Sequence, residues 1–384
     1  MIEETLTMSR KERRRLVVME QVKAGGLTLV EGAERMGLSY RQAKRVWKRF
    51  REQGHWGLVH ASRGRVSNRR LPGTLKEEAL ALFKRHYDDY GPTLASEVLE
   101  EEHGVKVHPE TLRRWLHGAC LIVPRTRLRQ HRRRRERRPC FGELVQLDGS
   151  HHAWFEERGE PCCLMVAVDD ATGRTLCRMS REETARAALE LLEHWIERHG
   201  VPAALYVDRK NIYRSDREVT TEEKRTGTGA LTDFGRACWR LGIELIFARS
   251  PEAKGRVERK NGVLQDRLVK ELRRRGLSAI GETNAVLDDF TSRLDKRFAR
   301  APASAIDRHR RSPGRRILRE TLCWEEQRSV GRDATVSYGG DVYQILDGRH
   351  GPRPKERVTV RRRLDDTLAL VHGERLLRFR RAAP

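Results

Sequence analysis

The chain of 384 residues lacks several features that would assign it to common protein classes. Its longest apolar run, CCLMVAV at 162–168, is far shorter than the roughly 20 residues that cross a membrane. The opening residues contain no apolar signal-peptide core, and none of the seven cysteines forms a C-x-x-C pair. No Gly-Lys dipeptide occurs, which excludes a Walker-type phosphate loop. We therefore expect a reduced cytoplasmic protein without membrane association, structural zinc or a nucleotide cofactor.

Acidic residues are too few to balance the basic ones, and the formal net charge is +24. The excess lies in two flanks: residues 1–140 carry 32 Lys and Arg against 17 Asp and Glu, and residues 301–384 carry 19 against 11. Residues 141–300 are nearly neutral, with 28 against 27. Because basic segments attract polyanions and release their counterions, these flanks favour a nucleic acid as the partner.

Residues 1–58 have the pattern of three short helices separated by glycine turns. Ser9, Thr28 and Ser39 are each placed to cap the start of one helix. The third helix is apolar on one face, and its other face carries Arg41, Lys44, Arg45 and Lys48. This arrangement is typical of a helix-turn-helix domain, whose last helix enters the major groove of DNA. From this segment alone, an ordinary helical hairpin with a charged solvent face is an equal alternative.

The same pattern recurs in residues 74–122, which favours DNA binding over the plain hairpin. Its last helix carries Arg113 and Arg114 beside apolar residues. The segment 59–73 reads as a basic linker that can follow a groove or the DNA backbone. The segment 123–139 contains nine arginines and reads as a second linker, or as an arm that orders on phosphate.

Residues 140–300 predict an α/β domain. Strands are expected at 143–155, 161–173, 174–180, 203–208 and 243–248, with helices at 182–199, from about 232, and at the end. Asp148 lies in or at the end of the first strand, Asp208 closes the fourth, and Glu258 lies in the first turns of the last helix. Phosphoryl transfer with two metals needs carboxylates that converge on ions about 4 Å apart. Each of the three alone could equally be a turn or surface residue.

Further polar residues surround these carboxylates. Glu252 precedes the last helix in a Pro-containing loop, so its position is less fixed than that of Glu258. The histidines at 151 and 152 could support Asp148, although strand histidines are more often simply packed, and the Asp pair at 169–170 closes a hairpin and receives no catalytic role. The residues expected to border the metal pocket and hold a DNA strand are Lys254, Arg256, Lys260 and Asn261.

The last part of the chain returns to strand patterning. Residues 301–328 read as a linker, and residues 329–384 alternate as short strands, with a hairpin at Gly339-Gly340. We expect a small basic β-barrel here, suited to nucleic acid rather than to catalysis.

Three segments, QLDGS, YVDRKNIY and SPEAKGRVERKNGVLQDRL, resemble in this order the catalytic core of DDE transposases and retroviral integrases. The resemblance is closest to bacterial insertion-sequence transposases of the ISNCY-like kind, covers nearly the whole chain, and implies a ribonuclease-H-like core at 140–300. It implies that Asp148, Asp208 and Glu258 bind two Mg²⁺ ions, with Mn²⁺ as a substitute. Two departures are visible: 49 residues separate Asp208 from Glu258, more than in retroviral integrases, and their N-terminal His/Cys zinc module is missing.

The function implied by this resemblance is that of a bacterial transposase in the cytoplasm, associated with the nucleoid. It would bind terminal inverted repeats, free 3′-OH ends and join them to target DNA by two-metal transesterification. Since two ends are joined together, its partners would be double-stranded DNA and further copies of the chain in a synaptic complex. Two alternatives stay open: a DNA-binding regulator or inactive transposase remnant without cleavage, and a nuclease that hydrolyses RNA in hybrids. The intact carboxylates count against the first, and the DNA-reading units against the second.

Overall fold

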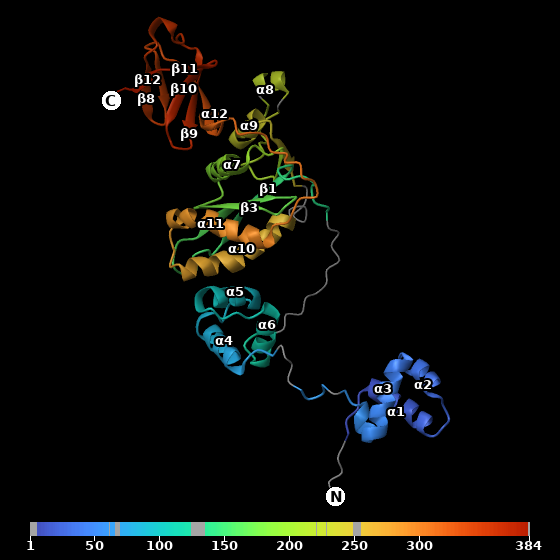
Figure 1. The fold of residues 1–384 in the computed structure, drawn as a ribbon. Coiled ribbons are helices and arrows are strands. Elements are labelled where there is room, and N and C mark those ends of the chain that lie inside the picture. The colour runs from blue at the N-terminus through green and yellow to red at the C-terminus, as the bar shows by residue number, and fades with distance from the viewer. Residues whose placement is uncertain are drawn as a thin grey trace. The chain divides into compact units, whose positions relative to one another are not determined.

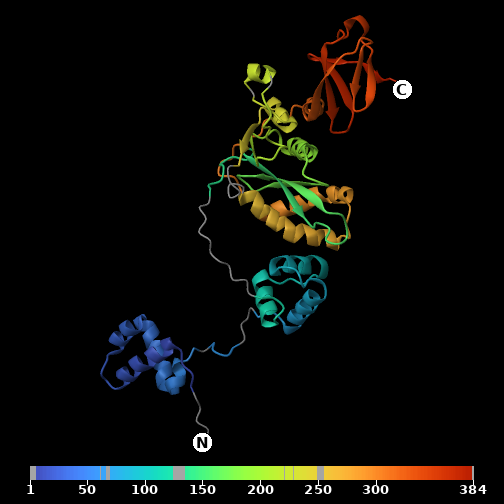
Figure 2. The ribbon, with the colours of Figure 1, turned by 180° about the vertical axis from the view of Figure 1, so that it is seen from behind.

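The computed structural model describes residues 6–60, 62–65, 70–123, 135–219, 221–227, 229–248 and 255–382 (Figure 1). The chain divides into two compact units, residues 1–127 and 128–384. Figure 2 gives the same ribbon from behind. No helix within the described ranges is long and apolar enough to cross a membrane.

The first three helices confirm the predicted caps. They are α1 (Arg10–Lys23), α2 (Leu29–Met36) and α3 (Tyr40–Gln53). Ser9, Thr28 and Ser39 each accept a hydrogen bond from the backbone amide three residues on, whose own side chain reaches back to the cap in a capping box. Gly37 ends α2 in the left-handed conformation, at φ +65°. The helices pack around Val18, Met19, Val46, Phe50 and Leu58.

Three more helices follow in the same unit: α4 (Gly73–His86), α5 (Pro92–His103) and α6 (Pro109–Gly118). Gly104 ends α5 in the left-handed conformation, and Pro109 occupies the first turn of α6, where its missing amide proton costs no helical hydrogen bond. Phe83, Leu99, Leu112 and Leu116 form the centre of a separate core. The predicted recurrence of a three-helix unit is confirmed.

The second unit contains a five-stranded sheet in the order β3-β2-β1-β4-β5. Its strands are β1 (Val145–His152), β2 (Cys162–Asp169), β3 (Thr175–Ser180), β4 (Ala204–Val207) and β5 (Glu244–Phe247). The first three strands pair antiparallel, whereas β4 runs parallel to both β1 and β5. The predicted α/β core is confirmed.

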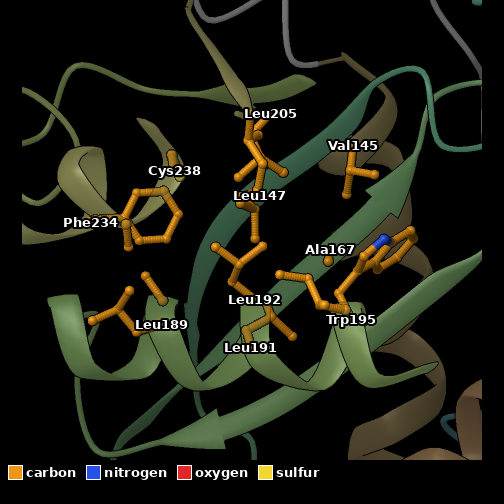
Figure 3. Packing of buried hydrophobic residues seen from close by; sticks show 14 of the residues in the cluster. Val145, Leu147, Ala167, Leu189, Leu191, Leu192, Trp195, Leu205, Phe234 and Cys238 are labelled. Atoms are coloured by element: carbon orange, nitrogen blue, oxygen red, sulfur yellow. The ribbon is translucent and has the colours of Figure 1, made fainter. Parts of the chain in front are cut away.

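Helices cover both faces of this sheet. On one face, α7 (Ala185–His199) and α9 (Asp233–Arg240) pack through residues such as Leu192, Trp195 and Phe234 against Leu147 of β1 (Figure 3). On the other face, α10 (Gly255–Arg274) and α11 (Ile280–Phe298) bury their own apolar stripes. The short helix α8 (Thr221–Thr226) lies in the polar stretch before α9. Helix α11 was not anticipated from the sequence.

The ends of the core are paired with each other. A β-bridge joins Phe141, just before β1, to Asp307, and a second joins Val201 to Arg310. The stretch around 304–310, predicted to be linker, therefore belongs to the edge of the core. The C-terminal sheet also begins earlier than expected, because β6 (Cys323–Ser329) directly follows α12 (Arg315–Thr321).

The C-terminal strands form two sheets rather than the predicted barrel. The first has the order β11-β10-β9-β6 and the second β12-β8-β7, and no closed sheet is formed by the described strands. Their bounds are β7 (Thr335–Tyr338), β8 (Asp341–Ile345), β9 (Arg357–Arg363), β10 (Leu368–His372), β11 (Arg375–Leu377) and β12 (Phe379–Arg381). Both sheets contribute to one core around Val336, Val360 and Leu370, so a shared apolar interior is reached without closing the hydrogen-bond ladder.

Candidate active site

Strand β1 presents alternate residues to α10. Its even-numbered side chains meet helix residues one turn apart: the Val257 amide donates to Gln146 Oε1 (3.3 Å), Asn261 Nδ2 to Asp148 Oδ2 (3.0 Å), and Gln265 Nε2 to Ser150 Oγ (3.2 Å). The match follows from geometry, because two strand residues rise about 6.6 Å and four helix residues about 6 Å. Asp148 is therefore held in the middle of a polar seam between sheet and helix.

Asp208 comes at the end of the strand next to β1. Strands β1 and β4 pair in parallel, with Val145 opposite Leu205 and Gln146 opposite Tyr206. Asp208 directly follows β4. If this register continued by two residues, Asp208 would lie opposite Asp148 at the strand spacing of about 4.8 Å, and the same alternation would start both side chains from the α10 face.

Glu258 is exposed in the first turn of α10. It precedes Asn261, the residue bonded to Asp148, by three positions, and residues three apart are neighbours on a helix surface. A carboxylate in a first helical turn is also favoured by the helix dipole. Glu252 and Lys254 lie outside the described residues.

A buried acid, Glu183, is linked to Asp208 through Lys210. Lys210 Nζ contacts Glu183 Oε2 at 2.5 Å and Asp208 Oδ2 at 3.4 Å, and the Lys210 amide donates to Asp208 Oδ1 at 3.0 Å. The Glu183 side chain is 4% exposed. Burial lowers the pKa of Lys210, but its hydrogen bond to Glu183 and the charges of both acids outweigh this and raise the pKa above its usual value. A Cβ at Gly149 would lie 2.3 Å from Glu183 Oε2, so glycine beside Asp148 leaves the space that Glu183 fills.

Two other groups face this acid cluster. Burial, together with the charges of Glu183, Asp208 and Asp148, raises the pKa of the Tyr213 hydroxyl well above its usual value. Burial and the charge of Glu183 raise the pKa of the Cys163 thiol to about 12, so the thiol is protonated. His151, which reaches within 3.9 Å of Glu183, completes a His-Cys-Glu group with ligand atoms within 4.8 Å of one another.

The predicted carboxylates suit a hard cation. Among the described residues, Asp148, Asp208 and Glu258 do not form a group as tight as that of His151, Cys163 and Glu183. Their donor set is nonetheless all oxygen, which Mg²⁺ prefers to thiolate or imidazole. Asn261 Oδ1, on the amide that binds Asp148, is buried and has no hydrogen-bond partner among the residues that the structure describes. An oxygen left without a partner at this point fits a site that takes a cation.

Known proteins are similar to this chain over most of its length. A candidate transposase of Sinorhizobium fredii, y4bF, is 42% identical over 337 residues, which cover 87% of this chain and 72% of that protein. The chain belongs to the transposase family. The transposase for insertion sequence IS1202 of Streptococcus pneumoniae is 27% identical over 343 residues, covering 80% of this chain and 72% of that one.

Family models and solved structures cover the parts of this transposase. A helix-turn-helix domain model matches residues 14–65, and a homeodomain-like domain model matches residues 42–116. Two solved structures are similar: a simian T-cell lymphotropic virus intasome in complex with a PP2A regulatory subunit, and the catalytic core domain of BIV integrase. The first is 18% identical, with TM-score 0.36, and covers 80% of this chain and 99% of its own. The second is 22% identical, with TM-score 0.28, and covers 44% of this chain and 90% of its own.

The basic residues predicted to bind DNA differ in their exposure between the two units of the transposase. In the helical unit, all six are exposed: Arg41, Lys44, Arg45, Lys48, Arg113 and Arg114. Their contacts are at the surface, such as Lys48 with Glu52 at 3.8 Å and Arg113 with Glu110 at 2.9 Å. These side chains are therefore accessible to the phosphates and nucleobases of DNA.

In α10 the basic residues predicted to bind DNA instead lie against acidic residues of the protein. Arg256 Nε lies 2.6 Å from Asp170 Oδ1, and Lys260 Nζ lies 3.9 Å from Asp295 Oδ1. The two basic side chains are only 12% and 10% exposed. Burial lowers the pKa of Lys260 below its usual value. No motif in the sequence identified Glu183 or Lys210 as neighbours of the site, although Lys210 stands only two positions after Asp208.

Proposed function

We propose that the protein binds the terminal inverted repeats of an insertion sequence, frees their 3′-OH ends and joins them to target DNA. The observations that support this proposal are the parallel pairing of Gln146 with Tyr206, two residues before Asp148 and Asp208 respectively, and the hydrogen bond from Asn261 of the Glu258 helix to Asp148. Family membership supports the same conclusion.

In this mechanism the three carboxylates are the ligands of the divalent ions. Two Mg²⁺ ions, or Mn²⁺ in their place, would supply charge stabilisation at the attacking and leaving oxygens of an in-line displacement. The chain's own groups orient the ligands: Asn261 holds one oxygen of Asp148, and the amide and ammonium of Lys210 hold those of Asp208. No side chain needs to act as nucleophile, because water and then the DNA 3′-OH attack the phosphodiester.

The helical unit would supply recognition of the ends. Exposed bases on α3 and α6 are positioned as on recognition helices, and two units in tandem suit a long site. We propose that the metal pocket is bordered by Lys254, Arg256, Lys260 and Asn261. The last three contact other protein groups, so their more direct role is to support the pocket rather than to hold DNA. Joining two ends requires at least two copies of the chain, which we propose meet in a synaptic complex.

The test is strand joining in vitro with labelled duplex from the DNA flanking the gene, a target plasmid and Mg²⁺ or Mn²⁺. Glu258→Gln should lose joining almost completely, a larger effect than the roughly 10–100-fold typical of residues that only support a ligand. Glu282→Gln is the matched control, because Glu282 is likewise an exposed acid in a first helical turn, that of α11.

Three outcomes separate the alternatives. Metal-dependent joining by wild type and Glu282→Gln, but not by Glu258→Gln, supports the transposase and its third ligand together. Tight binding to the ends without cleavage under either metal favours a DNA-binding regulator or an inactive remnant. Joining by Glu258→Gln at the wild-type rate excludes Glu258, and Glu252→Gln is then the variant to test.

A further inference from the structure

A carboxylate outside the proposed ligand set is completely buried at the end of β2. Asp170 is 0% exposed, and four donors converge on it. Gln146 Nε2 (2.8 Å), Arg256 Nε (2.6 Å) and the Arg135 guanidinium donate to Oδ1, and the Arg138 amide (2.7 Å) donates to Oδ2. A buried acid costs free energy unless it is paired and hydrogen-bonded, and Asp170 meets both conditions.

Two of these donors fix the first turn of α10: Arg256 belongs to that turn, and Gln146 binds its backbone. Gln146 is itself fully buried and uses both ends of its amide: Nε2 donates to Asp170, and Oε1 accepts from the Val257 backbone amide at 3.3 Å. The first amides of a helix have no partner within the helix, so this acceptor fixes the start of α10. Arg256, one residue earlier, is held by its side chain. Both residues immediately precede Glu258.

The same carboxylate also binds the end of the arginine-rich segment. Arg135 and the Arg138 amide both bind Asp170, and Arg256 Nη2 donates to the Arg135 carbonyl at 3.0 Å. Arg137 donates to the carbonyls of Asp170 and Ala171. The start of α10, which lies far along the sequence, therefore meets β1 and residues 135–138 at one buried charge.

We propose that Asp170 is a positioning residue that sets the place of Glu258 in the active site. This inference rests on the proposed function, because Glu258 is taken as a metal ligand. Asp170 touches neither DNA nor metal in this scheme. It acts through Gln146 and Arg256, which fix the helical turn from which Glu258 projects, and it links that turn to the arginine-rich segment, whose own proposed role is to follow phosphates.

The charge of Asp170 should matter more than its shape. Asp170→Asn preserves volume and one acceptor oxygen, but it leaves the guanidinium of Arg256 without its counter-charge in a place where only 12% of that side chain reaches solvent. We expect the first turn of α10 to loosen, strand joining to fall about 10–100-fold, as for other residues that orient metal ligands, and binding to the terminal repeats to remain unchanged.

The experiment measures hydrogen exchange and strand joining on the full-length protein. Asp170→Asn should speed amide exchange in 255–262 while leaving α7 (185–199) as protected as in wild type. Asp216→Asn is the matched control, because Asp216 is an exposed aspartate that pairs with Arg214 at the surface. Exchange faster throughout the second unit would show a general loss of stability and would overturn a positioning role, as would unchanged exchange in 255–262 with full joining.

A second pair of variants covers the case in which Asp170→Asn does not fold. Arg256→Gln should reproduce the loss of joining, and Arg256→Lys, which keeps the charge, should restore part of it. Equal activity of these two variants would contradict the role of the ion pair. If wild type itself joins no DNA, the proposed function fails, whereas the exchange data still show whether Asp170 fixes the turn.

Discussion

The basic residues of α3 and those of α10 look alike in the sequence but differ in the folded protein. Arg41, Lys44 and Arg45 are exposed, whereas Arg256 and Lys260 are largely covered and pair with aspartates. Both stretches read as lysine- and arginine-rich helices. The difference teaches that positive charge alone does not identify a DNA contact, because the basic side chain can instead pair with a carboxylate that is distant in the sequence. Exposed bases should control binding, and paired bases should control the geometry of catalysis.

The largest effects on strand joining are expected where a lysine or arginine forms an ion pair with a proposed metal ligand. Asp208→Asn should abolish strand joining, because it removes the ligand charge. Lys210→Met should lower joining about 10-fold, less than the first variant, because the Lys210 backbone amide still holds Asp208 Oδ1. Joining rates measured over a series of Mg²⁺ concentrations check both variants. The comparison breaks if Lys210→Met instead weakens binding to DNA ends and leaves joining of bound ends intact.

A smaller effect, on binding alone, is expected from the exposed bases. Lys44→Gln should lower affinity for the terminal repeats and reduce the slope of log K against log salt by about 0.9 if it removes one phosphate contact. Fluorescence anisotropy at several salt concentrations measures the slope. The joining rate of ends already bound should stay at the wild-type value, since the three proposed metal ligands all belong to the other unit of the chain.

The matched paired base should leave that slope unchanged. Lys260→Gln removes a charge from α10, but its partner is Asp295 and its side chain is almost buried, so no counterion of DNA is displaced by it. The same anisotropy series serves as the measurement. A slope reduced as much as in Lys44→Gln would mean that Lys260 leaves Asp295 to bind phosphate, and the distinction between the two helices would then be lost.

The smallest effect concerns the stability of the helical unit. Ser39→Ala removes the side-chain cap of α3 and should lower the free energy of unfolding by about 1 kcal/mol. Thermal or urea unfolding of the full chain, followed by circular dichroism, detects the change. Ser62→Ala is a suitable control, because Ser62 lies outside any helix and is exposed. Equal losses for both variants would show that the cap adds nothing.

Local features of the fold could be predicted because their causes are local. The caps at Ser9, Thr28 and Ser39 and the left-handed turn at Gly37 depend on residues within one helical turn. Helix α11 was missed, although Thr283, Leu287, Phe290 and Leu294 are spaced to fill one face. The charged stretch around them reads as solvated unless that spacing is followed. The barrel was inferred from alternation alone, which does not determine how the strands divide between sheets.

The place of two proposed ligands in the fold could be predicted from the apolar runs before them: Asp148 in or at the end of the first strand, and Asp208 at the end of the fourth. In the structure Asp148 lies within β1 and Asp208 directly follows β4, and these strands pair in parallel. The partners of the bases could not be foreseen, since Asp170 lies 86 residues from Arg256 in the chain. Glu183 was overlooked for the same reason: only the folded sheet brings it behind Gly149. Whether Asp148, Asp208 and Glu258 bind the metal stays a prediction.

The pairing of Phe141 with Asp307 and of Val201 with Arg310 has a consequence for how such proteins are assembled from parts. Because the two ends of the catalytic core meet at the same edge, the stretch from about 141 to 310 can be cut out or inserted at a single point of another chain. We therefore expect this stretch to tolerate the exchange of the segments before and after it, because its own two ends stay paired with each other.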